Sequence, residues 1–341
     1  MSLVAAATGA VERLPLPDAI TRAGIAALVS RTGRRLDGVP PDAERAFARA
    51  MADKPIACSP QAANTQHYEV PAAFFRAVLG GRRKYSCCLY ANPSDTLDQA
   101  EEHALAQTAA HAELADGQRI LELGCGWGSL SLWMAQHFPN AAITAVSNSH
   151  SQRAFIEGET ARLGLGNLRV ITADMNDFDA GAKFDRVVSV EMWEHMSNWQ
   201  ALLARVRGWV ENDGRLFLHV FSHRSAPYAF DTADKADWIA QHFFTGGIMP
   251  SHGLIRHLDE HFVLDSEWRW SGLHYQRTAL DWLARFDARQ ATIGPILAEV
   301  YGADALLWRR RWRLFFLATA GLFGARGGQD WGVSHYRLAP R

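Results

Sequence analysis

Residues 119–130 read RILELGCGWGSL, and this stretch decides the fold. A short apolar run of strand length ends in alternating glycines, and a helical pattern follows over about residues 129–137. Glycines let the backbone approach a ligand closely, and the first turn of a helix presents free N–H groups. The G-x-G-x-G spacing is neither the dinucleotide fingerprint nor a P-loop. It predicts a nucleoside-type ligand site, with an ordinary tight turn as the alternative. Glu122, beside the glycines, would suit a ligand with a cationic amine.

The pattern downstream of this stretch alternates between short strands and helices. Strand-like runs are AAITAVS, NLRVITA, FDRVVSV and GRLFLHVF, with helical patterns at about 151–163 and 198–210. Such alternation is typical of βαβ units around a parallel sheet. Periodicity therefore predicts a doubly wound α/β core over about 115–225.

The flanking segments have a different character. Residues 1–115 show short helical patterns, with an expected linker at 56–64, and the tail from Tyr228 is aromatic-rich and mostly helical until a strand-like run at 333–338. We expect residues 1–115 to form a helical segment that contributes to the ligand site. Residues 116–341 would form the core, with a cap inserted at about 226–330.

Composition excludes several classes of protein. The 341 residues are 48% hydrophobic, and 35 basic against 36 acidic residues give a net charge of −1. This balance argues against a polybasic nucleic-acid binder. The four cysteines form no CxxC pair, so neither zinc nor a disulfide framework is expected, and reduced thiols in a cytoplasmic setting fit best. No run reaches the roughly 18 apolar residues of a membrane span, and we read no signal peptide.

The segment EMWEHM at 191–196 gathers titratable groups at the end of a predicted strand. Open α/β sheets place their sites at the carboxyl ends of strands. Glu191, Glu194 and His195 are therefore candidates for acid–base chemistry. The alternative is a helix N-terminus at which the carboxylates interact with the helix dipole.

Several of these motifs resemble a known family. ILELGCGWGSL is similar to motif I of class I S-adenosylmethionine (SAM) methyltransferases, and NTQHYEVPAAFF, KYSCCLY and TLDQAEEHAL resemble segments of the cyclopropane-fatty-acid synthase superfamily. Within it, EMWEHM, WIAQHFFTGGIMPS and FGARGGQDWGVSHY look most like coclaurine N-methyltransferases, which methylate the ring nitrogen of benzylisoquinolines. The resemblance covers roughly residues 60–338. It implies a class I SAM-methyltransferase fold, a Rossmann-like sheet with N-terminal helices and a helical, aromatic-rich C-terminal cap.

The resemblance also implies a SAM site. Most Rossmann-type sites carry an acidic residue where this chain has Ser147 and Asn148, a departure shared with the family. The implied contacts are Tyr85 and Ser86 with the SAM carboxylate, Gly124 and Gly126 with the methionine moiety, Ser147 and Gln152 with the ribose, and Asp174, Met175 and Asn176 with the adenine.

The chemistry implied is displacement at a methyl carbon by a neutral nucleophile. A secondary ammonium must first lose a proton, and a carboxylate–imidazole pair can hold the cation and take that proton. The amine methyltransferases use a Glu-His pair that matches Glu194 and His195. Cyclopropane synthases typically have glycine where this chain has Glu191. A carboxylate there is costly beside an alkene and favourable beside an ammonium, so we favour a small-molecule amine substrate.

A competing interpretation is methyl or methylene transfer to an unsaturated lipid. The resemblance matches Cys87, Glu194, His219 and Tyr275 to the residues with which a cyclopropane synthase binds bicarbonate. Bicarbonate is therefore an alternative second ligand besides SAM. Because amine methyltransferases can keep similar residues, this set does not decide the question. Cys87 could equally be a buried thiol and His219 a core histidine.

The C-terminal region raises two further expectations. In the family, residues of the cap close the substrate pocket, and Trp331 matches one of them, while most other aromatics here should be core. Thr245 begins a glycine-containing loop that could act as a hinged lid. Residues 308–341 carry seven arginines and one aspartate, a departure from the family. We favour a helix with a solvated arginine face over peripheral contact with an anionic membrane. No feature fixes an oligomeric state.

Overall fold

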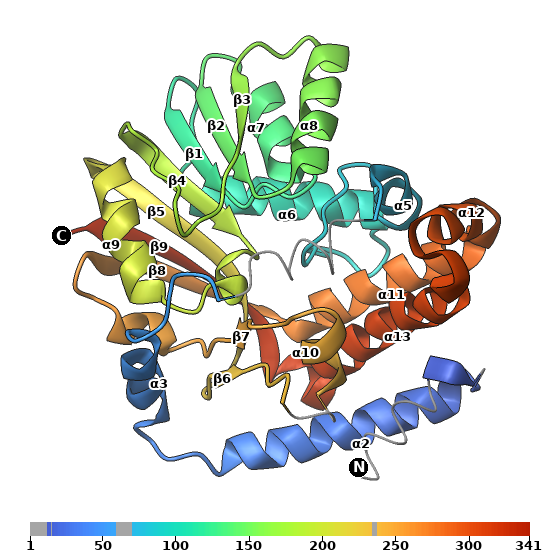
Figure 1. Ribbon diagram of the computed structural model, residues 1–341. Helices are drawn as coiled ribbons and strands as arrows, with labels where there is room; N and C mark the ends of the chain where they lie inside the picture. Colours follow the sequence, from blue (N-terminus) through green and yellow to red (C-terminus); the bar gives the residue numbers. More distant parts are fainter. Residues whose placement is uncertain (1–11, 15, 59–69, 234–236) are drawn as a thin grey trace.

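The computed structural model describes residues 12–14, 16–58, 70–233 and 237–341. One large sheet crosses the molecule in the order β3-β2-β1-β4-β5-β9-β8 (Figure 1). Its strands are β1 (Arg119–Leu123), β2 (Ala142–Ser147), β3 (Leu168–Thr172), β4 (Phe184–Val190), β5 (Val210–His223), β8 (Phe262–Ser271) and β9 (Trp331–Pro340). A small pair, β6 (Tyr228–Ala229) and β7 (Ile248–Met249), lies outside this sheet. The predicted methyltransferase-type α/β fold class is confirmed.

The strand order reverses at β1. Strands β1 to β5 are parallel, while β9 runs antiparallel between β5 and β8. The chain leaves β1 for β2 and β3 on one side and then returns to β4 on the other. Such a switch point opens a crevice at the carboxyl ends of the strands. The segments after β1 and β4 are the glycine turn and EMWEHM, so the topology brings both motifs to that crevice.

Helices cover both faces of the sheet because successive strand residues point to opposite sides. Ile120 packs with residues of α6 and α7, whereas Leu121 and Leu123 pack with residues of α3 and α9. The bounds are α3 (Ala43–Met51), α6 (Leu97–His111), α7 (Ser129–His137), α8 (His150–Leu163) and α9 (Trp199–Trp209). Residues 193–195 form the short helix η1 (Trp193–His195) at the site, and η2 (Leu254–His257) follows β7.

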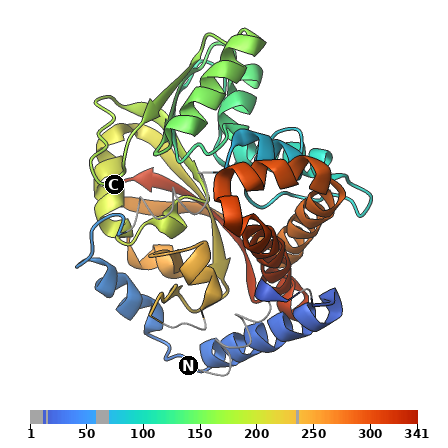
Figure 2. The ribbon, with the colours of Figure 1, turned by 45° about the vertical axis from the view of Figure 1, so that its right-hand side comes forward.

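The C-terminal helices gather beside one end of the sheet and α2 packs against α13 (Figure 2). They enclose an aromatic core that includes Trp282, Phe286, Trp312 and Phe316, which confirms that most aromatics there are core. The elements are α2 (Asp18–Asp37), α5 (Ala72–Val78), α10 (Trp238–His242), α11 (Gly272–Ala288), α12 (Gln290–Tyr301), η3 (Gly302–Asp304), α13 (Ala305–Phe323) and η4 (Ala325–Gly328).

Strand β8 is the main feature that the sequence pattern did not predict. It lies inside the mostly helical cap expected at 226–330, yet it pairs with β9 as an edge of the main sheet. Its residues are largely half-exposed, so the apolar run that marks the inner strands is missing. Residues 59–69, which hold most of the expected linker and the start of one family-like segment, lie outside the described part of the chain.

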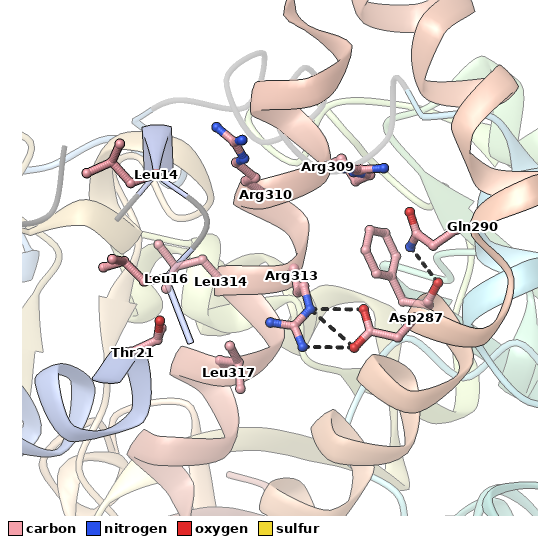
Figure 3. A pocket seen from close by; sticks show the side chains of 11 residues that line it. Leu14, Leu16, Thr21, Asp287, Gln290, Arg309, Arg310, Arg313, Leu314 and Leu317 are labelled. Carbon is pink, nitrogen blue, oxygen red and sulfur yellow. Dashed lines mark hydrogen bonds and ion pairs between the residues drawn. The ribbon is translucent and has the colours of Figure 1, made fainter. Parts of the chain in front are cut away.

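The basic segment is tied to the N-terminal helix rather than merely solvated. Figure 3 shows Arg313 beside a pocket between α13, α11 and the residues that precede and begin α2. Its guanidinium donates to both oxygens of Asp18, at 2.5 and 2.9 Å, and to Asp287 at 2.9 Å. This pocket shares no lining residue with the glycine-turn pocket described below. Among the described residues, no helix is long and apolar enough to cross a membrane.

Candidate functional site

The glycine turn forms the floor of a pocket at the carboxyl ends of the strands. Gly124 has φ of 80° and Gly126 has φ of 52°, a region that favours glycine. A Cβ on Gly124 would lie 2.6 Å from the Cβ of Met192, so close packing also requires glycine there. A Cβ on Gly126 would meet nothing within 4 Å in the described structure, because this residue faces the open pocket. The turn therefore offers bare backbone to a ligand.

One pocket brings together residues that the sequence analysis assigned to both cofactor and chemistry. Among the predicted residues, its walls contain Gly124, Gly126, Ser147, Gln152, Asp174, Met175, Glu191 and His195. Thr245 also lines it, while the hinged-lid role expected of its loop stays a prediction. Wall residues that the sequence analysis did not predict are Ala57, Val146, Asn148, Ala173, Met192 and Met196. Most of these contribute backbone or apolar side chains to the wall, and such residues give no recognisable signal in the sequence.

The corner at the end of β2 fits a ribose. The Ser147 hydroxyl donates to Oε1 of Gln152 at 2.6 Å, and Ser149 caps α8 by accepting from the Gln152 backbone N–H. Nε2 of Gln152 is buried and has no hydrogen-bond partner among the described residues. An unpaired buried donor costs about 1–3 kcal/mol, which an acceptor on a ligand would offset. The amide is thus placed to donate to a sugar hydroxyl, and the pocket fits SAM at this corner.

Two residues that were predicted to contact the cofactor lie behind the pocket wall. Glu122 is buried and accepts a hydrogen bond from Ser131 on α7, and burial raises the pKa of its carboxyl to about 8. Asn176 holds the backbone of Ala57 from both sides, with its oxygen 3.0 Å from the amide nitrogen and its nitrogen 3.1 Å from the carbonyl oxygen. Neither lines the pocket, but Asn176 fixes Ala57, which does.

Tyr85 and Ser86 also lie outside the pocket lining. The Tyr85 ring packs against Phe75 and Trp282, and Ser86 accepts from the buried ammonium of Lys84 at 2.5 Å. Their contact with the SAM carboxylate stays a prediction. Trp331 is fully buried at the start of β9, where its indole N–H donates to the Tyr228 hydroxyl at 3.3 Å. It does not line this pocket, so its role against a substrate also stays a prediction.

Glu191 is the centre of the site. Its carboxylate accepts from the Cys87 backbone N–H at 2.9 Å, from Nε2 of His219 at 3.2 Å and from the Tyr275 hydroxyl at 2.6 Å. Its backbone has φ of 47°, where a non-glycine residue is strained by about 1–2 kcal/mol. Its own N–H donates to the His219 carbonyl at 2.8 Å and so holds this conformation. Three of the four residues that the resemblance matches to a bicarbonate site, Cys87, His219 and Tyr275, therefore contact the Glu191 side chain.

Glu194 lies apart from that cluster. It is fully buried, does not line the pocket, and accepts from the Phe221 backbone N–H at 2.6 Å, while Oε2 has no hydrogen-bond partner among the described residues. His195 does line the pocket and stacks on Phe244 with ring centroids 5.0 Å apart. Of the predicted Glu194–His195 pair, the imidazole thus faces the pocket and the carboxyl lies behind it.

The electrostatics separate the two carboxyl groups. Burial raises the pKa of Glu191, and the Lys84 ammonium, the Cys87 N–H and the Tyr275 hydroxyl oppose that rise. Burial and the nearby Glu191 carboxyl raise the pKa of Glu194. Glu191 accepts three hydrogen bonds whereas Glu194 accepts one, from the Phe221 N–H, so these contacts stabilise a negative charge better on Glu191 than on Glu194. Burial lowers the pKa of His195 to about 4, so its ring is neutral at pH 7.

The buried cation is the functional feature that the sequence analysis missed. Lys84 precedes the predicted Tyr85-Ser86 pair, and its ammonium is held by Ser86 and by the Cys87 carbonyl at 2.7 Å. Only 2% of the Lys84 surface is exposed. Buried lysine is rare unless it is paired, and nothing in its neighbours along the chain distinguishes it from a solvated lysine.

The contrast between the two glycines gives a test. Gly124→Ala should lower the free energy of unfolding by more than about 2 kcal/mol, because it adds steric overlap to backbone strain. Gly126→Ala should lower it by only about 1 kcal/mol but reduce the affinity for S-adenosylhomocysteine (SAH) at least about tenfold, because its methyl group intrudes into the pocket. Denaturant unfolding and calorimetric titration measure both quantities. Unchanged SAH affinity in Gly126→Ala would place the cofactor elsewhere.

Comparison with known proteins identifies the family. The family model for mycolic acid cyclopropane synthetase matches residues 58–327 of this chain. The chain is 35% identical to (S)-coclaurine N-methyltransferase of Thalictrum flavum subsp. glaucum over 82% of this chain and 79% of that protein. It is 30% identical to cyclopropane-fatty-acyl-phospholipid synthase of Escherichia coli over 79% of this chain and 66% of that protein.

A solved structure agrees in fold along almost the whole chain. The crystal structure of coclaurine N-methyltransferase bound to N-methylheliamine and SAH superimposes with a TM-score of 0.92 and 31% identity, covering 99% of this chain and 100% of that one. The glycine turn, the pocket at the switch point and these matches lead to one assignment: the chain belongs to the mycolic acid cyclopropane synthetase family and is a SAM-dependent methyltransferase.

Proposed function

We propose that this enzyme methylates the nitrogen of a small secondary or tertiary amine of the benzylisoquinoline or another aryl-alkyl type. The similarity to coclaurine N-methyltransferase supports this class of substrate. The site supports it independently through a buried anion at the pocket wall, because Glu191 both lines the pocket and carries the local negative charge. An ammonium is the substrate group that such an anion attracts.

The observation that carries the proposal is the position of the Glu191 carboxylate. In the cyclopropane synthases that this chain resembles, Cys87, His219 and Tyr275 match residues that hold bicarbonate. Here the Glu191 carboxylate accepts the hydrogen bonds from these three positions, with donor–acceptor distances of 2.6–3.2 Å. The side chain thus supplies a fixed carboxylate where the lipid enzymes recruit a free anion. This arrangement argues against a bicarbonate requirement and against an apolar alkene at the same wall.

The residues can perform the proton chemistry that N-methylation needs. SAM, when bound, supplies a methyl group on a sulfonium. Glu191 holds the substrate ammonium by charge and takes one N–H proton, which leaves the nitrogen lone pair free to attack. Burial raises the pKa of this carboxyl, which makes it a stronger base than an exposed glutamate. We assign the base to Glu191 in preference to Glu194 because only Glu191 faces the pocket.

His195 and Glu194 have supporting places in this scheme. The neutral His195 ring, held flat against Phe244, can accept a hydrogen bond from the substrate and orient the amine. Glu194 accepts from the Phe221 N–H and so holds β5 in place. As a neutral acid it adds no second negative charge beside Glu191.

Release of SAH tests the function directly. The purified enzyme would be offered a panel of secondary and tertiary aryl-alkyl amines in one pool and vesicles of unsaturated phospholipid in another. We expect SAH release with amines alone. Product mass does not discriminate, because N-methylation and cyclopropanation both add one CH₂. Release with vesicles alone would contradict the proposal and favour the lipid alternative.

Substitutions at the pocket wall test the roles. Glu191→Gln removes the base while keeping its size, and we expect kcat to fall by about 10²–10⁴. We expect kcat of His195→Ala to fall by a similar factor, because the ring orients the amine. Glu194→Gln should cost less, because it exchanges one neutral hydrogen-bonding group for another. Steady-state kinetics with one accepted amine measures all three, and SAH affinity is the control. A larger loss in Glu194→Gln than in Glu191→Gln would reassign the base to Glu194.

A further inference from the structure

Lys84 brings a buried positive charge close to the Glu191 carboxyl without lining the pocket itself. We propose that Lys84 is a positioning residue for the methyl transfer: its ammonium orders residues 84–88, the Cys87 loop, around Glu191 and keeps Glu191 ionised near neutral pH. The inference rests on the proposed amine methylation, because that scheme requires Glu191 to be ionised before it takes a proton from the substrate.

The side chain of Lys84 folds back over its own loop. Its Nζ lies 2.5 Å from the hydroxyl oxygen of Ser86 and 2.7 Å from the carbonyl oxygen of Cys87. The backbone N–H of Cys87 in turn donates to Oε1 of Glu191 at 2.9 Å. The ammonium therefore fixes the loop at the very residue whose N–H reaches the carboxylate.

A carboxyl group on α6 holds the backbone from which this side chain starts. Glu101 is fully buried and accepts hydrogen bonds from the backbone N–H groups of Gly80 at 3.0 Å, Arg82 at 2.6 Å and Lys84 at 3.1 Å. Three bonds to one carboxyl group leave this stretch of backbone little freedom. The point at which the Lys84 side chain enters the core is thereby set.

Lys84 and Glu191 place opposite charges in the same buried region. The hydrogen bonds of the ammonium go to neutral groups, so they satisfy its donors without balancing its charge. Burial raises the pKa of Glu191, and the Lys84 ammonium is the largest influence in the opposite direction, ahead of the Cys87 N–H and the Tyr275 hydroxyl. Because a buried charge is costly unless it is paired, each of the two groups stabilises the ionised form of the other.

The other titratable groups in this region favour their neutral forms. Those that face the two charges are Glu101 of α6, Glu194 and His195 of η1, His219 of β5, Tyr275 of α11, His335 of β9 and the thiols of Cys87 and Cys88. Burial lowers the pKa of every imidazole in this set and raises the pKa of every acid in it. Among these groups, Lys84 is thus the cation that balances Glu191.

The pH dependence of kcat tests this role, with a strongly basic secondary amine that stays an ammonium over the range measured. The rate should fall at acid pH as Glu191 is protonated in the enzyme–substrate complex. Lys84→Met removes the cation, so the pKa of Glu191 rises further and the acid limb should move up by about one to two pH units. At the midpoint of the wild-type limb, kcat should then be roughly five- to fiftyfold below wild type. On the alkaline plateau it should return to within about twofold.

Two further variants separate charge from hydrogen bonding and from general effects. Lys84→Gln keeps an N–H donor for the loop but carries no charge, so its acid limb should move as in Lys84→Met. Arg83→Gln is the matched control, because it removes a positive charge from the adjacent residue. The Arg83 guanidinium lies over the Phe155 ring, 4.7 Å from its centroid, and 3.5 Å from Glu159 on α8. Its acid limb should coincide with that of wild type.

A uniform loss of kcat at every pH, with an unmoved acid limb in both Lys84 variants, would overturn the proposal, because Lys84 would then only support the fold. An equal shift in Arg83→Gln would overturn it too, since the effect would not be specific to the buried ammonium. Failure of both Lys84 variants to fold, checked by circular dichroism, would also favour a purely structural role. If the wild type releases no SAH with any amine, the proposed function fails first; an unmoved limb in an enzyme that does methylate amines contradicts the role of Lys84 alone.

Discussion

The site depends on one constraint, a carboxylate held in a buried position at the end of β4. Glu191 keeps its charge there because an N–H from the Cys87 loop, an imidazole from β5 and a phenol from α11 all donate to it, with the Lys84 ammonium nearby. Removing a charge from water is costly unless such partners are supplied. The N-terminal segment, the sheet and the cap must therefore assemble together before this carboxylate has its hydrogen-bond donors.

The fold meets this constraint through its switch point and through local strain. The reversal of strand order at β1 places the glycine turn beside the end of β4, so that the cofactor pocket and Glu191 share one wall. The positive φ of Glu191 turns its side chain into that wall, in a conformation that glycine adopts without strain. Strain retained at a functional position is a common feature of active sites. A glycine in the same place would remove the carboxylate and leave the Cys87 N–H, His219 and Tyr275 without their shared acceptor.

Much of this was predictable from sequence, and the rest was not for identifiable reasons. Strand and helix periodicity located β1 to β5, and the glycine and EMWEHM motifs located the pocket. The family resemblance drew attention to Glu191 but assigned the base to the Glu194–His195 pair. The contacts of Glu191 are 28, 84 and 104 residues away, so that only the tertiary fold brings them together. Burial of Lys84 and the pairing of His219 with His335 leave no local pattern. Strand β8 was missed because a half-exposed edge strand lacks a continuous apolar run.

The most direct measurement of the central claim is the response of Glu191→Gly to bicarbonate. The wild type should turn over an amine at the same rate with and without bicarbonate, because its own carboxylate fills the ring of donors. Glu191→Gly should fold, lose at least about a hundredfold in kcat, and recover part of that rate when bicarbonate or formate is added. Glu191→Gln, which still fills the space, should not recover. A wild type that requires bicarbonate, or a glycine variant indifferent to it, would contradict the account.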